Sequence, residues 1–282
     1  MKVMSECFGN FFVLNGKLTS AGFFINSLIY EGESVYEVIK SINGIPVFFG
    51  DHMNRLYKSV EIIGRRMLCD KDLIRAAVLA LAGAEKHGMI NIKIVFNYRQ
   101  DAGNCLIYYL EPHYPDEEQY KAGVRGLLYH AERKDPVSKV IDISLRSEIN
   151  RQLVLENCYE ALLVNRNGCI TECSRTNVFF IRKDCLFTAP DSLILSGITR
   201  KQILEVCNEI SIPVVFECVR HDEIGRFESA FMTGTSPVIL PFNSINGVKF
   251  RIGHPIIELL RTRYMLKAEK SISDFLYHPP AS

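Results

Sequence analysis

The stretch EALLVNRNGCITECSRTNVFFIRKDCLFTAP, residues 160–190, is a run of short apolar segments separated by polar and glycine-containing breaks. Its break at Asn167-Gly168 is the dipeptide that two-residue hairpin turns prefer, because both turn positions take a positive φ. Apolar segments of this length between such turns are typical of β-strands. Residues 160–190 therefore predict consecutive strands of a sheet.

Within this run, Glu172 stands between Cys169 and Cys173. Three interpretations compete: a metal or redox pair made by the cysteines, a satisfied polar residue without a role, or a carboxylate that serves a bound cofactor. No second cysteine or histidine pair lies nearby to complete a tetrahedral metal site, so we predict no metal. The residues alone leave the other two interpretations open.

Regular patterns continue on both sides of the run, and helices alternate with strands. On the C-terminal side we predict a helix over 199–210, a strand over 213–219, a strand and turn over 229–247, and a closing helix over 255–270. On its N-terminal side we predict a strand over 124–133 and a helix over 145–157.

The first part of the chain predicts strand, turn and strand from residue 11 to 49, with turns at Asn15-Gly16 and Asn43-Gly44. A helix with Asp51 as N-cap should follow, and a second should end at Gly88. The apolar face of the first of these helices comprises Met53, Leu56, Val60 and Ile63. Residues 90–98 and 104–112 predict a hairpin.

The polar segment 113–123, HYPDEEQYKAG, shows no clear period and is the linker that the sequence favours. We therefore predict an α+β chain of two domains. The smaller N-terminal α/β domain spans residues 1–118, and the larger, β-rich C-terminal domain with helices spans 119–282.

Net charge, hydropathy and cysteine content exclude several classes of protein. The net charge of +1 offers no electrostatic case for binding nucleic acid or an anionic membrane. No apolar run approaches the roughly 20 residues that span a bilayer, and Glu6, Gly9 and Asn10 interrupt the N-terminal stretch where a signal peptide would be apolar. Nine scattered cysteines predict free thiols, which fits a cytoplasmic protein.

Two turns are candidates for holding an anion. In LSGITRKQIL, Thr199 and Gln202 have the spacing of a capping box, and Gly197 leaves the N–H groups of Ile198 and Thr199 open. In MTGTSPVILP, hydroxyl residues surround a glycine at the end of an apolar strand, namely Thr233, Thr235 and Ser236. Taken singly, a plain helix cap and a plain turn explain these stretches as well.

Two cationic residues have an equally open interpretation. Arg55 lies on the helix expected after Asp51, and an isolated arginine there usually faces water. Lys139 begins a run of alternating apolar residues, where it is either an edge residue or a desolvated nucleophile. His52 has no assigned role.

The order of four stretches resembles the class IV aminotransferases, the fold-type IV pyridoxal-phosphate enzymes. That family includes the branched-chain and D-amino acid aminotransferases and aminodeoxychorismate lyase. The resemblance runs from about Gly32 to Gly247. It rests on GESVYEVIKSINGIPVFFGDHMNRLYKSVEIIG, YEALLVNRNGCITECSRTNVFFI, LSGITRKQIL and ESAFMTGTSPVILP.

The resemblance implies roles for the ambiguous residues. Lys139, at the family's distance before YEALL, would form the Schiff base with pyridoxal 5'-phosphate, and Glu172 would bind the pyridine nitrogen. Arg55, the N–H groups of Ile198 and Thr199, and the Thr235 hydroxyl would hold the phosphate.

The sequence departs from the family at several positions. Cys173 replaces the glycine that usually follows the glutamate, and Ser144 replaces a tyrosine of branched-chain enzymes. The Arg-x-His pair that grips a carboxylate in D-amino acid enzymes is absent from IKIVFNYRQ. Tyr36 matches those enzymes. The substrate-binding residues implied are Tyr36, Ser236 and Lys93.

These observations predict a cytoplasmic, homodimeric aminotransferase that acts on small-molecule amino and keto acids, with branched-chain amino acids among the family's substrates. The alternative is a lyase resembling aminodeoxychorismate lyase, which releases pyruvate; a catalytically inert binding relative is a third. The sequence does not name the amino donor or its handedness.

Overall fold

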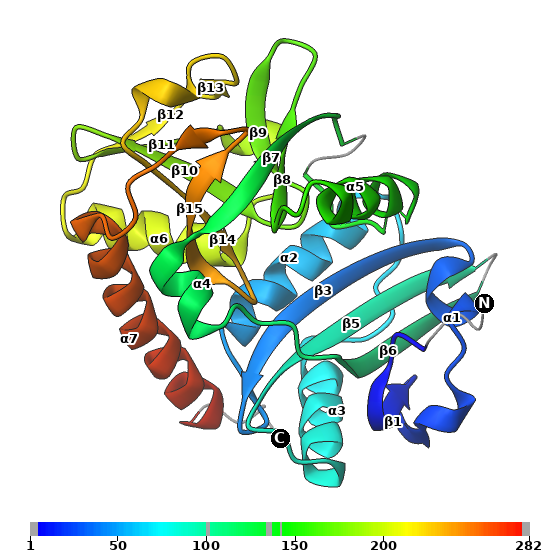
Figure 1. Ribbon diagram of the computed structural model, residues 1–282. Coiled ribbons are helices and arrows are strands. Elements are labelled where there is room, and N and C mark those ends of the chain that lie inside the picture. Colours follow the sequence, from blue (N-terminus) through cyan, green and yellow to red (C-terminus); the bar gives the residue numbers. More distant parts are fainter. Residues whose placement is uncertain (1–4, 100–101, 134–136, 142, 278–282) are drawn as a thin grey trace. The chain divides into compact units, whose positions relative to one another are not determined.

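The computed structural model describes residues 5–99, 102–133, 137–141 and 143–277. By its internal contacts the chain forms two compact units (Figure 1). Unit 1 comprises Met1–His113, Ser138–Ile141 and Ala268–Ser282, and unit 2 comprises Tyr114–Val137 and Asp142–Lys267. Both units are therefore discontinuous along the chain. The domain boundary that the sequence predicts after residue 118 remains a prediction.

Unit 1 is built on a six-stranded antiparallel sheet in the order β2-β1-β6-β5-β3-β4. Its strands are β1 Phe8–Leu14, β2 Lys17–Ser20, β3 Glu33–Ile42, β4 Ile45–Pro46, β5 Met89–Arg99 and β6 Ala102–Leu110. Both predicted Asn-Gly turns are confirmed, since Asn15, Gly16, Asn43 and Gly44 all have positive φ. The hairpin predicted for residues 90–112 is also confirmed, as β5 and β6.

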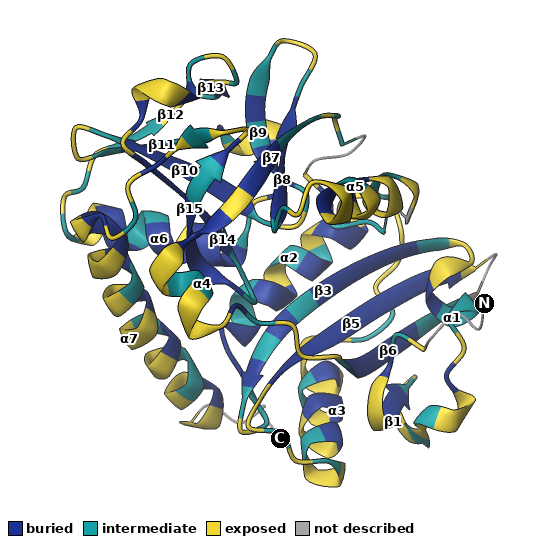
Figure 2. Cartoon of the chain, in the orientation of Figure 1, coloured by how far each residue is buried: buried dark blue, intermediate teal, exposed yellow. Residues whose placement is uncertain are grey.

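The helices of unit 1 pack on both faces of this sheet. They are η1 Ala21–Phe23, α1 Ser27–Tyr30, α2 Phe49–Ile62 and α3 Lys71–Ala84. Met53, Leu56 and Val60 of α2 are buried against β5, together with the apolar side of α3. Figure 2 shows β3 and β5 as mostly buried strands.

Two predicted helix ends are wrong. The N-cap of α2 is Phe48, whose φ of 53° places it in the left-handed region, and Asp51 lies inside the first turn. The Phe48 N–H donates to the Ser271 hydroxyl, so a contact distant in sequence takes over the capping. Helix α3 ends at Glu85 rather than at Gly88, because the chain turns extended there.

Unit 2 contains a ten-stranded mixed sheet in the order β12-β11-β10-β14-β15-β7-β8-β9-β13, with β16 beside β15. Its first strands are β7 Val124–His130, β8 Glu160–Val164, β9 Cys169–Cys173, β10 Asn177–Arg182 and β11 Cys185–Thr188. The others are β12 Val214–Phe216, β13 Val219–Arg220, β14 Ser229–Gly234, β15 Val238–Ile245 and β16 Val248–Lys249. The strands predicted for residues 160–190 are thus confirmed as β8 to β11.

The helices of unit 2 include one, α4, that was not predicted from the sequence. They are α4 Glu117–Ala122, α5 Ile143–Leu155, η2 Asp191–Leu193, α6 Ile198–Glu209, η3 Ile224–Arg226 and the first half of α7 Pro255–Tyr277. The segment predicted as a linker forms α4, which begins with a capping box between Asp116 and Gln119. The second half of α7, from Ala268, belongs to unit 1. The α+β class is confirmed.

All nine cysteines are free thiols, as the sequence predicts. In the part of the chain that the structure describes, no helix combines the length and the apolar character needed to cross a bilayer.

Candidate functional site

Lys139 is held in unit 1 by main-chain hydrogen bonds to β3. The Tyr36 N–H donates to the Lys139 carbonyl (3.1 Å), and the Ile141 N–H donates to the Ser34 carbonyl (3.2 Å). The Lys139 N–H donates to the Ser59 hydroxyl of α2 (3.3 Å). A four-residue return of the chain to unit 1 therefore fixes this lysine between a strand and a helix.

Arg55 is anchored on the same helix by a buried carboxylate. Its Nε and Nη2 donate to the two oxygens of Glu37, each at 2.7 Å, in a fork that fixes the plane of the guanidinium. His52, one helical turn before Arg55, lies 2.8 Å through Nδ1 from Glu37. Glu37 is fully buried. These contacts give Arg55 a single orientation.

The charges within this cluster are well defined. Burial alone would raise the pKa of Glu37, but the charge and hydrogen bonds of Arg55, with help from His52, lower that pKa to about 2. Burial lowers the pKa of His52, against the raising influence of Glu37. The cluster is therefore an ionised carboxylate with one arginine and a neutral histidine at neutral pH.

This charge arrangement predicts an acid-sensitive fold. The pKa of Glu37 is lower in the folded chain than its ordinary value of 4.5, so its contribution to stability is complete above pH 4.5 and is lost as the pH falls toward 2. That contribution is on the order of 3 kcal/mol. Urea midpoints between pH 5 and 3 should fall more steeply for the wild type than for Glu37→Gln. Equal slopes for the two proteins would contradict this assignment.

Tyr36 and Lys93 lie on the sheet face opposite to Glu37. The Lys93 Nζ lies 5.0 Å from the centre of the Tyr36 ring, and the Lys139 Nζ lies 4.9 Å from the same ring. At these distances both ammonium groups are attracted to the ring by a cation–π interaction. Of the predicted residues, Tyr36, Arg55, Lys93 and Lys139 therefore belong to unit 1.

Glu172 is buried in unit 2 with its carboxylate held at both oxygens. Arg133 Nη1 lies 3.4 Å from Oε1, and the Leu195 N–H donates to Oε2 at 3.4 Å. Only 4% of the residue is exposed. Its neighbour Cys173 is buried, and burial raises the pKa of that thiol well above its usual range. The cysteine is therefore an inert thiol, whereas the carboxylate has a cationic neighbour.

The start of helix α6 differs from the predicted capping box. Its N-cap is Gly197, which has no side chain to accept the first N–H groups, and Thr199 lies inside the first turn. A Cβ on Gly197 would lie 2.0 Å from the Asn177 side-chain oxygen, so any larger residue here would force the Asn177 side chain to move. The amides of Ile198 and Thr199 are thus at a helix N-terminus without a side-chain cap, where an anion is favoured.

The structure brings the three C-terminal motifs together within unit 2. Asn177 pairs with Thr233 between β10 and β14, and its side chain donates to the Leu195 carbonyl (2.9 Å). A Cβ on Gly234 would lie 2.8 Å from Thr176. The Thr233 hydroxyl is buried and has no hydrogen-bond partner in the described part of the chain. The residues predicted here are Glu172, Ile198, Thr199, Thr235 and Ser236.

Sequence reasoning missed Glu37, His52 and Arg133 as parts of these clusters. The signal for the first two was present: His52 and Arg55 are three residues apart on one helix face, and Glu37 shares the face of β3 that carries buried Val35 and Ile39. A carboxylate on an otherwise apolar strand face requires a cation. The sequence around Arg133 shows no comparable pattern that would have predicted its contact with Glu172.

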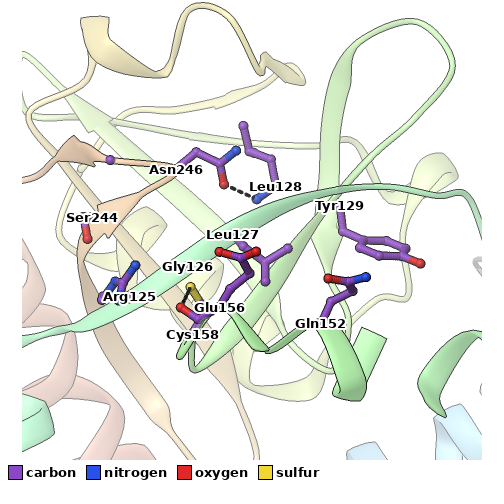
Figure 3. A pocket seen from close by; sticks show the side chains of 11 residues that line it. Arg125, Gly126, Leu127, Leu128, Tyr129, Gln152, Glu156, Cys158, Ser244 and Asn246 are labelled. Carbon is purple, nitrogen blue, oxygen red and sulfur yellow. Dashed lines mark hydrogen bonds between the residues drawn. The ribbon is translucent and has the colours of Figure 1, made fainter. Parts of the chain in front are cut away.

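Cavity volume alone does not identify these residues. A hollow of about 460 Å³ in unit 2 is lined by Arg125, Gln152 and Glu156, among others (Figure 3), and another of about 490 Å³ in unit 1 lies beside Cys69 and Cys105. Neither includes a predicted site residue. Among the described residues, no cluster of three or more histidines, cysteines or carboxylates is arranged to hold a metal ion.

Comparison with known proteins identifies the family. The model of the family "Amino-transferase class IV" matches residues 34–245. A D-alanine aminotransferase of Bacillus licheniformis is 29% identical over 248 residues, which are 79% of this chain and 83% of the relative. A probable branched-chain-amino-acid aminotransferase of Rickettsia bellii is 29% identical over 266 residues, which are 85% of this chain and 88% of the relative.

Solved structures agree on the fold. The branched-chain aminotransferase from Thermoproteus uzoniensis, solved with norvaline, superimposes with a TM-score of 0.81 at 23% identity, covering 93% of this chain and 97% of that one. The chain belongs to the class IV aminotransferases, a family of pyridoxal-phosphate-dependent enzymes. The resemblance inferred from the sequence is therefore confirmed, and so is the fold.

Proposed function

We propose that this enzyme transfers an amino group between an amino acid and a 2-keto acid, and that Lys139 holds its pyridoxal 5'-phosphate. The placement of Lys139 is the observation that carries the proposal. Its main chain is bonded to β3 and to Ser59, whose hydroxyl in turn donates to the Arg55 carbonyl. Lys139 and Arg55, the arginine proposed for the phosphate, are thereby connected within unit 1.

The cofactor, when bound, supplies an electron sink that stabilises negative charge at the substrate Cα. Lys139 has two tasks in this chemistry. Its amine would hold the cofactor in the resting enzyme, and during turnover it would take the proton from the substrate Cα as general base and give it back as general acid. An amine on a fixed main chain can perform both tasks with a small movement of its side chain.

Glu172 would hold the proton on the pyridine nitrogen. Its burial removes water that would compete for this contact, and Arg133 stabilises its negative charge. Within unit 2, the N–H groups of Ile198 and Thr199 and the hydroxyl of Thr235 are proposed to contact the phosphate, a role that the family resemblance also gives to Arg55. The uncapped helix α6 and the unpartnered Thr233 hydroxyl fit such an anionic group.

Tyr36, Ser236 and Lys93 are proposed to contact the substrate. The ring of Tyr36 lies beside the ammonium of Lys139, so it would form a wall for the substrate at the reacting amine. Lys93 is the cation next to that ring, and we assign it to a carboxylate of the substrate. The proposed substrates are therefore acids that carry a carboxylate for Lys93, namely amino acids and 2-keto acids.

A panel of L- and D-amino acids tests this function directly. Each donor is mixed with the cofactor-loaded enzyme, and the loss of the visible absorbance of the lysine-bound cofactor is recorded, with and without 2-oxoglutarate or pyruvate as acceptor. An aminotransferase requires the keto acid for repeated turnover. Release of pyruvate without an added keto acid would instead identify the lyase alternative.

Replacing Arg55 should weaken cofactor binding. Arg55→Ala removes a charge-assisted contact worth roughly 1.5–3 kcal/mol, so the dissociation constant of pyridoxal 5'-phosphate should rise about tenfold or more. Arg55→Lys keeps the charge but loses the fork to Glu37, and should give a smaller rise. Arg65→Ala, at an exposed ion pair with Glu33, is the control. An unchanged dissociation constant in Arg55→Ala would show that Arg55 does not bind the phosphate.

Two further parts of the proposal concern the setting of the enzyme. We place it in the cytoplasm, because nine free thiols suit a reducing compartment. We also propose a homodimer, on the family resemblance. Light scattering during size-exclusion chromatography would give twice the 32.1 kDa mass of the chain, and a monomeric mass at working concentrations would oppose it.

A further inference from the structure

Lys93 is a buried ammonium that already has a counter-ion. It lies on β5 with only 3% of its side chain exposed, and Glu6 Oε1 forms an ion pair with its Nζ. An unpaired ammonium at this depth would be strongly unfavourable, since its hydration is lost. The Glu6 carboxylate is therefore the counter-ion of Lys93 inside unit 1.

Glu6 is held in place by hydrogen bonds to Tyr30 and Asn26, which do not belong to the strands of the sheet. Its second oxygen accepts a hydrogen bond from the Tyr30 hydroxyl (2.5 Å), and its N–H donates to the Asn26 side chain (3.1 Å). Its own side chain is 22% exposed, in contrast to that of Lys93. The carboxylate thus reaches the buried ammonium from the segment before β1 and remains open to water on its outer side.

The surroundings of Lys93 suit a carboxylate ligand. Its Nζ lies 5.0 Å from the Tyr36 ring centre and 5.9 Å from that of Tyr108. The Tyr108 hydroxyl is buried and has no hydrogen-bond partner among the described residues, so a donor remains unused beside the ammonium. An ammonium, a hydroxyl donor and aromatic walls together form a site for a carboxylate with an apolar body.

We propose that Glu6 is an internal competitor for the substrate's carboxylate at Lys93, and so limits the enzyme's affinity for its acids. This inference rests on the proposed function, which assigns Lys93 to the substrate. Two carboxylates at one ammonium repel each other, so a substrate must displace Glu6 or share its cation. Removing the Glu6 charge should therefore tighten binding, which is the reverse of what the loss of a binding residue would cause.

The test measures the binding of unreactive acids to the cofactor-loaded protein by calorimetry. Butyrate carries one carboxylate, and glutarate carries a second one at a distance. Glu6→Gln keeps the shape and the Tyr30 contact, and should lower the dissociation constant of at least one acid about tenfold. Glu31→Gln removes a carboxylate from an exposed pair with Arg99 and is the matched control, expected to change nothing.

Two more variants separate competition from indirect effects. In Glu6→Gln combined with Lys93→Met the gain should disappear, because the ammonium that received the ligand is gone. Glu6→Asp is one methylene shorter and cannot maintain its contacts with both Lys93 and Tyr30, so its effect should be intermediate. It provides the measurement if Glu6→Gln does not fold.

The outcomes are distinct. A gain shared by butyrate and glutarate assigns Lys93 to the carboxylate next to the reacting carbon, and a gain limited to glutarate assigns it to a distal carboxylate; both support the competitor role. Unchanged or weaker binding of both acids in Glu6→Gln would overturn it, as would a gain that persists without Lys93. Because binding is measured without turnover, absence of transamination would refute the proposed function separately.

Discussion

Borohydride reduction of the cofactor-loaded enzyme is expected to leave the pyridoxyl label on Lys139. Reduction converts the bond between a lysine amine and the cofactor into a stable secondary amine, so peptide mapping reports which lysine held the cofactor. An ordinary lysine, with a pKa near 10.4, is almost wholly protonated at neutral pH and is a poor nucleophile. A lysine fixed beside the cofactor forms an imine instead and loses that handicap.

Other lysines make this a demanding test. Burial lowers the pKa of Lys40 to about 8, so its amine is more reactive than that of an exposed lysine. Lys93 is buried too, and its ammonium forms an ion pair with the Glu6 carboxylate. Lys134 lies outside the described residues. Lys139 is bonded through Ser59 to the helix of Arg55, and we therefore expect it alone to carry the label.

Lys139→Ala should abolish transamination while leaving the fold intact. General acid–base catalysis alone contributes about 10²–10⁴-fold, and loss of covalent binding adds to this deficit, so turnover should fall by roughly 10⁴-fold or more. Lys40→Ala is the control and should retain turnover. A label on Lys40, Lys93 or Lys134, or on no lysine, would contradict the assignment, and so would near-normal turnover in Lys139→Ala.

Local patterns predicted the elements of this fold well, because their causes are local. Positive φ at Asn15-Gly16 and Asn43-Gly44 is a property of the dipeptides themselves, and both turns formed. The apolar face of α2 follows from helical spacing alone, and Met53, Leu56 and Val60 are buried as expected. In such cases tertiary structure only selects what the sequence already prefers.

Helix starts were less predictable, because tertiary contacts of the residues just before each helix determine where it begins. Asp51 and Thr199 are good capping residues, yet each lies within the first turn of its helix. The actual caps are Phe48, stabilised by Ser271 from a distant helix, and Gly197, required by the close approach of Asn177. Neither contact is visible in a local window, so propensity was overruled by packing.

The candidate site combines local and distant determinants in the same way. Motif order was sufficient to propose Lys139 and Glu172 as site residues, but the side chains that form ion pairs with such residues come from elsewhere in the chain. The buried Glu37 that orients Arg55 is 18 residues away from it, and Arg133 is 39 residues away from Glu172. Pairings over such separations follow from the sheet topology, which a single sequence does not display.

Glu172→Gln should leave cofactor binding largely intact while reducing turnover by about two or more orders of magnitude, or at least roughly 2.7 kcal/mol of transition-state stabilisation. The amide has nearly the same shape, so the Leu195 N–H can still donate to its oxygen. It lacks the negative charge that would hold a proton on the pyridine nitrogen, and without that proton the ring is a weaker electron sink.

A matched control separates this effect from general damage to unit 2. Glu160 is equally buried, and hydrogen-bonds Ser174 (2.5 Å) without belonging to the proposed site. Glu160→Gln should therefore lower the urea midpoint and leave the turnover of the folded enzyme nearly unchanged. Glu172→Gln should lower the turnover and leave the urea midpoint nearly unchanged. Steady-state kinetics and cofactor titration on both proteins decide the matter. Near wild-type turnover in Glu172→Gln would remove this carboxylate from the mechanism and return Glu172 to the role of a satisfied buried residue.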